Sequence, residues 1–494
     1  MPLRPLNREL TWLFPPTLED LIPMDHPVRF AAAFVGALDR ASWSDMEIAR
    51  DGDPLGAPAY DPRAVLCVWV YGFMTGVRST RKLEAACRDQ VPYLWLTGWG
   101  HPDHNTLWRF YQTHREQMRK LFKRTVRVAV KAGLVDLVVQ AVDGTKVKAN
   151  AAKERTYDQA GLKKLLERTE AAIQDLEAQN EGGDDPAPAR LPKRLADAKA
   201  LQEQVAAALE TVTAEDGPKH LNLTDADAQL MKGRQGFVAG YNAQAMVSPL
   251  DKKAAGRTGL FMTATAMSDC PADQDQLLPM IGRAAENTGA PATLTLADGG
   301  YHSGPNLEAC AAEKRPVVMP ESNRPAGEEP KPYGKDAFTY HPDSDSYTCP
   351  KGQTLRFAGE TRRKERPVTR VYRGSRVVCL ACPAFGVCTT DRRNGRMLQV
   401  GPQEQALRDH RAWMATEKAK AAYRQRKQLP EPVFGILKEQ QDARRFLLRG
   451  IAQVRAEWDL LAAAFNLRTL YRVWCNWVGQ RPTERRMLTG ALGC

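Results

Sequence analysis

The chain has 494 residues, too many for one small hydrophobic core, so we expect several structural units. Its 70 Lys and Arg residues outnumber 58 Asp and Glu residues, which suits a polyanionic partner without separating DNA from RNA or an acidic membrane surface. No signal peptide follows Met1, and the longest apolar run, around Val65 to Met74, is far too short to cross a bilayer, so we expect a cytoplasmic protein.

Residues 1–135 carry the start signals of several short helices. The predicted capping residues are Asp25, Asp61, Ser79 and Asn105. The helices predicted behind them cover residues 27–38, 63–74, 80–89 and 106–132, the last closed by Gly133. Short helices with basic faces are typical of domains that bind DNA grooves, although a bundle that only packs on its neighbour explains the pattern equally well.

An α/β core is predicted after residue 135. The apolar run of residues 138–142 ends at Asp143, and the run of residues 293–297 ends at Asp298. The segments between them read as an exposed second strand, two further strands and a helix: residues 145–149, 237–247, 260–266 and 273–288. An isolated Asp-Gly is more often a turn. Carboxylates at the end of the first strand and at the end of the strand that follows the helix favour a catalytic role and an RNase H-like core.

Glu431 opens an amphipathic helical stretch among basic residues. Lys438, seven residues later, shares its helical face and could reach a phosphate, whereas Glu439 is a rival acid two turns from Glu431. Tyr423 and Arg426 precede it on a basic run. A solvent-exposed charged helix explains the basic run but not its placement around one acid.

Asp143, Asp298 and Glu431 together suit phosphodiester chemistry. Two Mg²⁺ ions about 4 Å apart can clamp the attacking and leaving oxygens, and such hard ions need only a few carboxylates. We expect Asp143 to bridge the ions, Asp298 to hold one and Glu431 the other, with Mn²⁺ as a substitute. Tyr301 and His302 could contact the DNA backbone, although a surface or hydrogen-bonding role suits the histidine better.

Two segments interrupt the core. Residues 151–230 hold 16 acidic and 10 basic residues and two apolar stripes at helical spacing, which predicts an acidic helical-hairpin insertion. Residues 321–400 form a Cys-rich insertion, in which residues 351–400 carry 12 basic and 3 acidic residues. A structural Zn²⁺ site and free thiols in a reducing cell explain its cysteines equally well. These are Cys349, Cys379, Cys382 and Cys388.

The cysteine-rich segment also holds a dense set of basic residues, which indicates a phosphate-facing ribbon, with a disordered basic loop as the alternative. The set consists of Arg362, Arg363, Lys364, Arg366, Arg370, Arg373 and Arg376. On the third predicted strand, Asn242 and Gln244 could face the site, but a hydrogen-bonded polar pair on the sheet is the favoured interpretation.

Several motifs give the chain a resemblance to DDE transposases of bacterial insertion sequences, in the group whose third acid lies in a Tyr–Arg–Glu–Lys signature. The N-terminal part resembles the InsH-like transposase domain. The matching segments are residues 52–54, 71–73, 76–84, 102–107, 143–146, 240–244, 298–301, 445–450, 457–458 and 466–468.

The resemblance implies DNA cutting at element ends and strand transfer, with Asp143, Asp298 and Glu431 as the metal triad. The residues assigned to DNA contacts are Lys438, Arg426, Tyr423, Tyr301 and Arg445. Four residues, where the signature has three, separate Arg426 from Glu431, and the route of strand cleavage, through a DNA hairpin or otherwise, is left open. The implied partners are double-stranded DNA, as terminal inverted repeats and as target, and further copies of the chain in a synaptic complex on the bacterial nucleoid.

We therefore predict an α/β protein with an RNase H-like core, acting as a Mg²⁺-dependent transposase. Its predicted parts are a helical DNA-binding domain (1–135), the first part of the core (136–150 and 231–320), the acidic hairpin (151–230), the basic Cys-rich insertion (321–400) and a C-terminal helical part with the catalytic Glu (401–494). The alternatives are a nuclease on the same core that never joins DNA, and an inactive transposase-derived DNA-binding protein.

Overall fold

A computed structural model describes residues 16–48, 59–180, 193–233, 236–321, 332–362 and 367–480. The chain forms two compact units. The first contains residues 1–273, 279–292 and 427–494, and the second residues 274–278 and 293–426. Within the described ranges, no helix combines the length and apolar character needed to span a membrane.

Helices make up the N-terminal part of the first unit, as predicted. They are α1 (Pro27–Gly36), α2 (Arg40–Asp45), α3 (Pro62–Thr75), α4 (Thr80–Asp89), α5 (Val91–Thr97), α6 (His104–Met118) and α7 (Lys120–Lys131). Asp61 and Ser79 cap α3 and α4 as expected, each accepting a hydrogen bond from a first-turn N–H.

Two details of the predicted helices are wrong. Residues 106–132 lie in two helices and not in one, since α6 ends at Met118 and α7 begins after Arg119. The side chain of Arg119, between the two helices, pairs with Asp459 at 2.7 Å. The caps also lie elsewhere: His26 caps α1, and Asp103 caps α6 by accepting from Thr106 N at 2.7 Å.

An antiparallel sheet forms the centre of the first unit. The strands are β1 (Val139–Lys148), β4 (Gln229–Gly233), β5 (Gly236–Pro249) and β6 (Leu260–Ser268). The long strand β5 pairs with β1 along one edge, and with β4 and β6 in turn along the other. β1 is one continuous strand, because it pairs with β5 from Ala141 through Lys148. The predicted break after Asp143 is therefore wrong, and Asp143 lies in mid-strand.

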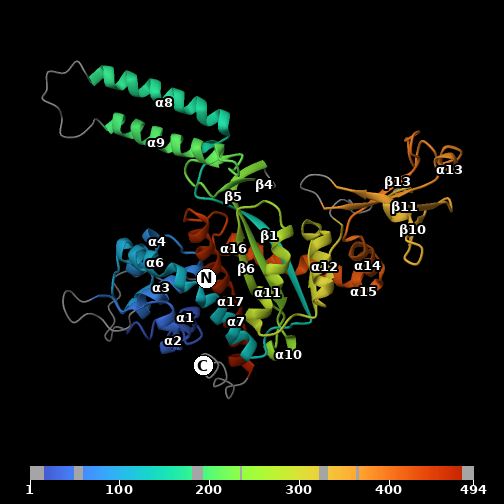
Figure 1. The fold of residues 1–494 in the computed structure, drawn as a ribbon. Coiled ribbons are helices and arrows are strands. Elements are labelled where there is room, and N and C mark those ends of the chain that lie inside the picture. Colours follow the sequence, from blue (N-terminus) through green and yellow to red (C-terminus); the bar gives the residue numbers. More distant parts are fainter. Residues whose placement is uncertain are drawn as a thin grey trace, which may run out of the picture. The chain divides into compact units, whose positions relative to one another are not determined.

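The 30-residue helix α17 (Ile451–Gln480) packs on this sheet and on the N-terminal helices (Figure 1). Trp458 is buried and donates to Gln244 O at 2.9 Å. Asn466 is fully buried and hydrogen-bonds to both a strand and a helix. Its Nδ2 donates to Met262 O of β6 at 2.9 Å and to Thr125 Oγ1 of α7 at 3.1 Å. α11 (Leu277–Thr288) and the short helices α10 (Lys252–Ala255) and α16 (Pro430–Gln440) complete the helices that flank the sheet.

The predicted helical hairpin is present as α8 (Gln159–Asn180) and α9 (Lys193–Thr213), which lie alongside each other (Figure 1). A small apolar cluster joins them, with Leu162 and Val205 fully buried. The short strands β2 (Thr156–Tyr157) and β3 (Leu221–Asn222) pair at the base of the hairpin.

The second unit has a different construction. Its strands β7 (Leu294–Leu296) and β8 (Val317–Val318) are parallel, and its helices are α12 (Gly304–Ala312), α13 (Arg376–Leu380), α14 (Glu404–Ala415) and α15 (Glu417–Arg424). An antiparallel five-stranded sheet contains β9 (Thr339–His341), β10 (Ser346–Thr348), β11 (Thr354–Thr361), β12 (Thr369–Arg373) and β13 (Met397–Val400). The Cys-rich insertion is thus an ordered sheet in its described part, and the disordered-loop alternative is wrong there. The chain is α/β, as predicted.

Candidate active site

The face of β1 that Gly144 occupies lies against a buried polar cluster. Asp273 Oδ1 accepts from Asn242 Nδ2 and from Gln244 Nε2, both at 2.7 Å, and Lys146 Nζ lies 3.7 Å from the same oxygen. A β-carbon at residue 144 would lie 2.4 Å from Gln244 Nε2 and 2.7 Å from Asp273 Oδ1. Glycine is therefore required where the strand meets this cluster. The predicted hydrogen-bonded pair of Asn242 and Gln244 is confirmed.

Asp143 lies on the opposite face, because side chains alternate along a strand. Thr145 shares that face, and its Oγ1 accepts a hydrogen bond from Lys438 Nζ at 2.5 Å. Helix α16, which carries Lys438, therefore packs on the face of β1 that bears Asp143. Asp143 is half-buried, so this carboxylate remains accessible to solvent.

The segment that follows α16 also lies along β1. Phe446 donates through its N–H to Lys148 O at 2.9 Å, and Arg445 forms a parallel β-bridge with Lys148. Glu431 is exposed in the first turn of α16, where the helix dipole favours a negative charge. The rival Glu439 is exposed too and pairs with Arg444 at 2.5 Å.

Asp298 belongs to the second unit and caps a short turn after β7. Its Oδ1 accepts from Gly300 N at 2.8 Å, and its Oδ2 lies 3.5 Å from Arg426 Nη2. The carboxylate side chain is 36% exposed while that of Arg426 is 10% exposed. The structure therefore brings Arg426 of the predicted signature to Asp298, and Tyr423 lies half-buried on the preceding helix α15.

Tyr301 cannot contact DNA from this position, so that prediction is wrong. Its side chain is fully buried, and its carbonyl accepts from Asn306 Nδ2 at 2.9 Å. His302 is also buried, with its ring centroid 5.8 Å from that of His410. Burial lowers the pKa of both histidines. His302 Nε2 has no hydrogen-bond partner among the described residues, so the structure supports neither the surface role nor the hydrogen-bonding role expected for this histidine.

A buried ion pair holds the turn between α16 and α17. Arg78 Nη1 lies 2.5 Å from Glu457 Oε1, and each side chain is 2% exposed. Arg78 Nη2 also donates to the carbonyls of Asp442 and Arg445, and Glu457 accepts from the N–H of Leu447 at 3.1 Å. The turn is thereby fixed while the side chain of Arg445 stays exposed. Arg445 remains available for the predicted DNA contact.

The four cysteines of the insertion line one cavity of about 30 Å³. Burial raises the pKa of the Cys388 thiol, Arg396 opposes that shift, and the nearby Cys349, Cys379 and Cys382 add to it. Within the described ranges, however, no three His, Cys, Asp or Glu side chains already form a group that could hold a metal ion. The cysteines are brought together without forming a finished metal site.

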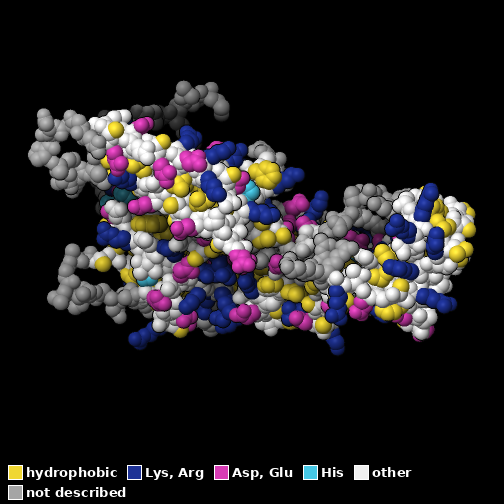
Figure 2. Space-filling view, turned by 45° about the horizontal axis from the view of Figure 1, so that its top comes forward, with side chains coloured by type: hydrophobic (Ala, Val, Ile, Leu, Met, Phe, Trp, Pro, Cys, Tyr) yellow, Lys and Arg dark blue, Asp and Glu magenta, His cyan; other side chains and the backbone are white. Residues whose placement is uncertain are grey.

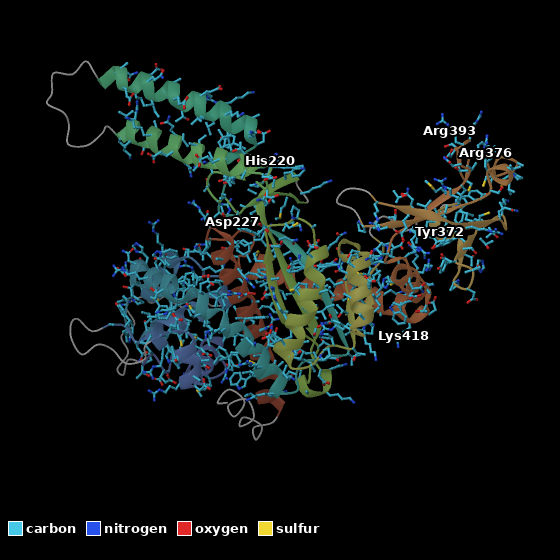
Figure 3. The ribbon with its side chains drawn as sticks, viewed as in Figure 1. His220, Asp227, Tyr372, Arg376, Arg393 and Lys418 are labelled. Atoms are coloured by element: carbon cyan, nitrogen blue, oxygen red, sulfur yellow. The ribbon has the colours of Figure 1, made fainter. Side chains whose placement is uncertain are left out.

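Some basic residues of the Cys-rich segment contact other side chains, and others are exposed to solvent. Arg370 pairs with Asp345 at 2.6 Å and lies over the Phe357 ring at 4.7 Å. Arg373 and Arg376 are exposed, and Arg376, labelled in Figure 3, is the first residue of α13. Lys and Arg side chains are interspersed with hydrophobic ones over this sheet (Figure 2). Arg362 is exposed, and the predicted basic residues 363, 364 and 366 lie outside the described residues.

Sequence analysis missed Asp273 and Arg78. Asp273 was assigned only to the start of a helix, and no local signal announces that it bonds two amides on β5. Arg78 lies in a recognised motif, but its partner Glu457 is 379 residues away. Long-range pairing of this kind leaves no periodicity in a single sequence.

Comparison with known families gives two matches. Residues 16–113 match a model described as "Transposase domain (DUF772)", and residues 348–471 match one described as "Transposase DDE domain". The second match includes Glu431 and Lys438, whereas Asp143 and Asp298 lie outside both ranges. No curated protein matches the chain. Together the two family matches indicate that the chain is an insertion-sequence DDE transposase.

Proposed function

We propose that this protein binds the terminal inverted repeats of an insertion sequence, cleaves DNA there and joins the cleaved strand to target DNA. The observation that carries the proposal is the packing of α16 on the Asp143 face of β1, inside a chain that matches a transposase DDE domain. The helix that carries Glu431 thereby contacts, through Lys438, the face of β1 on which we place Asp143. Copies of the chain holding two element ends would form the active complex.

The proposed ligands of two Mg²⁺ ions are Asp143, Glu431 and, from the second unit, Asp298. Their oxygens are the hard ligands that Mg²⁺ prefers, and all three side chains are at least partly accessible. When bound, the ions would supply an activated oxygen nucleophile and neutralise charge on the phosphate. The assignment of Asp143 and Asp298 is supported by the resemblance of their flanking residues and by their positions, Asp143 within β1 and Asp298 just after β7.

The cations around these acids have distinct proposed roles. Lys438 lies on the Asp143 face, where its ammonium would bind the scissile phosphate after leaving Thr145. Arg445 is exposed on the α16–α17 turn and would contact the DNA backbone. Arg426 is mostly buried and touches Asp298, so we assign it to orienting that carboxylate and not to a direct DNA contact.

The test uses full-length protein, labelled element-end DNA and target DNA with Mg²⁺ or Mn²⁺. Asp143→Asn, Asp298→Asn and Glu431→Gln should each abolish cleavage and joining while retaining binding to end DNA. Glu439→Gln is the matched control: this acid is exposed on the same helix, and its loss should leave most activity.

The outcomes separate the alternatives. Cleaved DNA without joined product under all conditions would identify a nuclease. Binding without cleavage by the unmodified protein would identify a DNA-binding regulator. Wild-type cleavage by any of the three acidic variants would remove that residue from the site.

A further inference from the structure

The Cys-rich sheet has very little core. Six buried residues form its apolar cluster, and Cys349 and Cys388 pack against that cluster. The cysteines come from three places: the β10–β11 turn, helix α13 with the residue pair that follows it, and the segment before β13. They nevertheless line a single cavity. About 10–15 Å³ of such space admits one water, so the 30 Å³ here fits an ion and no larger ligand.

The turn at Cys349 directs its sulfur toward backbone donors. Cys349 N donates to Gln353 O at 2.8 Å, and Gln353 N donates to Cys349 Sγ at 3.3 Å. Gly352, at φ +77°, allows the chain to turn back within this short segment. A hydrogen bond from an N–H to sulfur stabilises the thiolate, which is the form that binds metal.

The surroundings of Cys379 show the same features. Arg396 N donates to Cys379 Sγ at 3.4 Å. A β-carbon on Gly374 would lie 3.1 Å from this sulfur, and one on Gly395 would lie 3.2 Å from it. Two glycines thus leave room around one sulfur atom, and Cys382 follows it at the short Cys-x-x-Cys spacing found in zinc sites.

We propose that Cys349, Cys379, Cys382 and Cys388 bind one Zn²⁺ as thiolates, each thiol releasing its proton to solvent. The four side chains do not yet meet at metal-binding distances. A zinc–thiolate site needs sulfurs about 2.3 Å from the ion, and rotation of the cysteine side chains between staggered χ1 states is the movement that the proposal requires. The ion would hold together a sheet whose own core is too small to be stable.

Zinc content of the full-length protein, purified under reducing conditions and dialysed without chelator, tests the proposal. We expect about one zinc per chain in the wild type and in Cys270→Ser, a control because Cys270 is an exposed cysteine of the first unit. Cys379→Ser/Cys382→Ser should lose nearly all of it. Replacing zinc by Co²⁺ in the wild type should give the sulfur-to-cobalt absorption bands of a tetrahedral thiolate site. This second measurement needs no variant and is unaffected if the double variant misfolds.

Removing the ion with a chelator should expose residues 332–402 to protease while residues 59–180 stay protected. A wild-type protein without zinc and without a cobalt–thiolate spectrum would overturn the proposal. So would full zinc content in the double variant. Cysteines that become alkylated only after addition of a reductant would show disulfides in place of the metal. None of these readouts depends on DNA cleavage, so they stand apart from the proposed transposase activity.

Discussion

Replacing Gly144 by Ala tests whether the polar cluster behind β1 is rigid. The added methyl group would lie 2.4 Å from Gln244 Nε2, 2.7 Å from Asp273 Oδ1 and 2.8 Å from Asn242 Oδ1. All three atoms are ends of side chains, but Gln244 and Asn242 are fully buried and bonded to Asp273. They can move only by giving up those hydrogen bonds.

The expected loss follows from two effects. Overpacking costs about 1–3 kcal/mol, and leaving a buried amide without its acceptor costs about 1–3 kcal/mol. We therefore expect the free energy of unfolding to fall by about 2–6 kcal/mol. DNA cleavage should fall as well, because the strained residue is next to Asp143 in the same strand.

Urea unfolding of the full-length protein, followed by tryptophan fluorescence, measures the first effect. Gly282→Ala is the matched control: no atom lies within 4 Å of its β-carbon position, and alanine is favoured over glycine in a helix such as α11 by up to about 1 kcal/mol. Gln244→Ala removes the nearest atom and should recover part of the loss in the double variant. A Gly144→Ala protein as stable and active as the wild type would falsify the close-packed cluster.

Three further predictions concern other parts of the molecule. Glu457→Gln should cost about 3–5 kcal/mol in urea unfolding because it leaves Arg78 as an unpaired buried charge, whereas a loss below about 1 kcal/mol would mean that the pair is hydrated. Lys438→Met should reduce strand cleavage more than DNA binding, since one phosphate contact contributes little to total affinity; equal losses in cleavage and filter binding would contradict this role. Burial keeps the pKa of His302 and of His410 below the ordinary 6.5, so their contribution to stability is complete above pH 6.5 and is lost as the pH falls below it. Unfolding midpoints at about pH 7.5 and about pH 5.5 should therefore differ more in the wild type than in a His302→Gln/His410→Gln variant.

Local signals were sufficient for several elements. Asp61 and Ser79 predicted the starts of α3 and α4 because a cap acts within one helical turn. The apolar stripes predicted the helix pair α8 and α9, since each stripe repeats over about four turns or more. The spacing of apolar residues along the sequence therefore predicts such amphipathic helices directly.

The misses arose where distant contacts override local signals. Asp143-Gly144 reads as a turn, yet pairing with Ala245 and Gln244 of β5 keeps both residues extended. Tyr301 follows an acidic residue and reads as exposed, but it is buried in the second unit. The five-stranded sheet was missed because four of its strands are only 3 to 5 residues long, too short for an alternating pattern to be recognised.

The N-terminal helices and α16 are parts of one packed structure, which bears on how DNA binding and catalysis communicate. Gln441, at the end of α16, is fully buried and donates to Phe73 O at 3.0 Å. A β-carbon on Gly76, the residue that ends α3 at φ +82°, would lie 2.8 Å from Gln440 O. The chain after α3 thus touches the end of the helix that begins with Glu431, and Arg78 then fixes the following turn. Because packed side chains transmit displacements, a shift of the C-terminal end of α3 would be passed to the end of α16. The helical part of this protein therefore supports the acidic residues in addition to any contact that it makes with DNA.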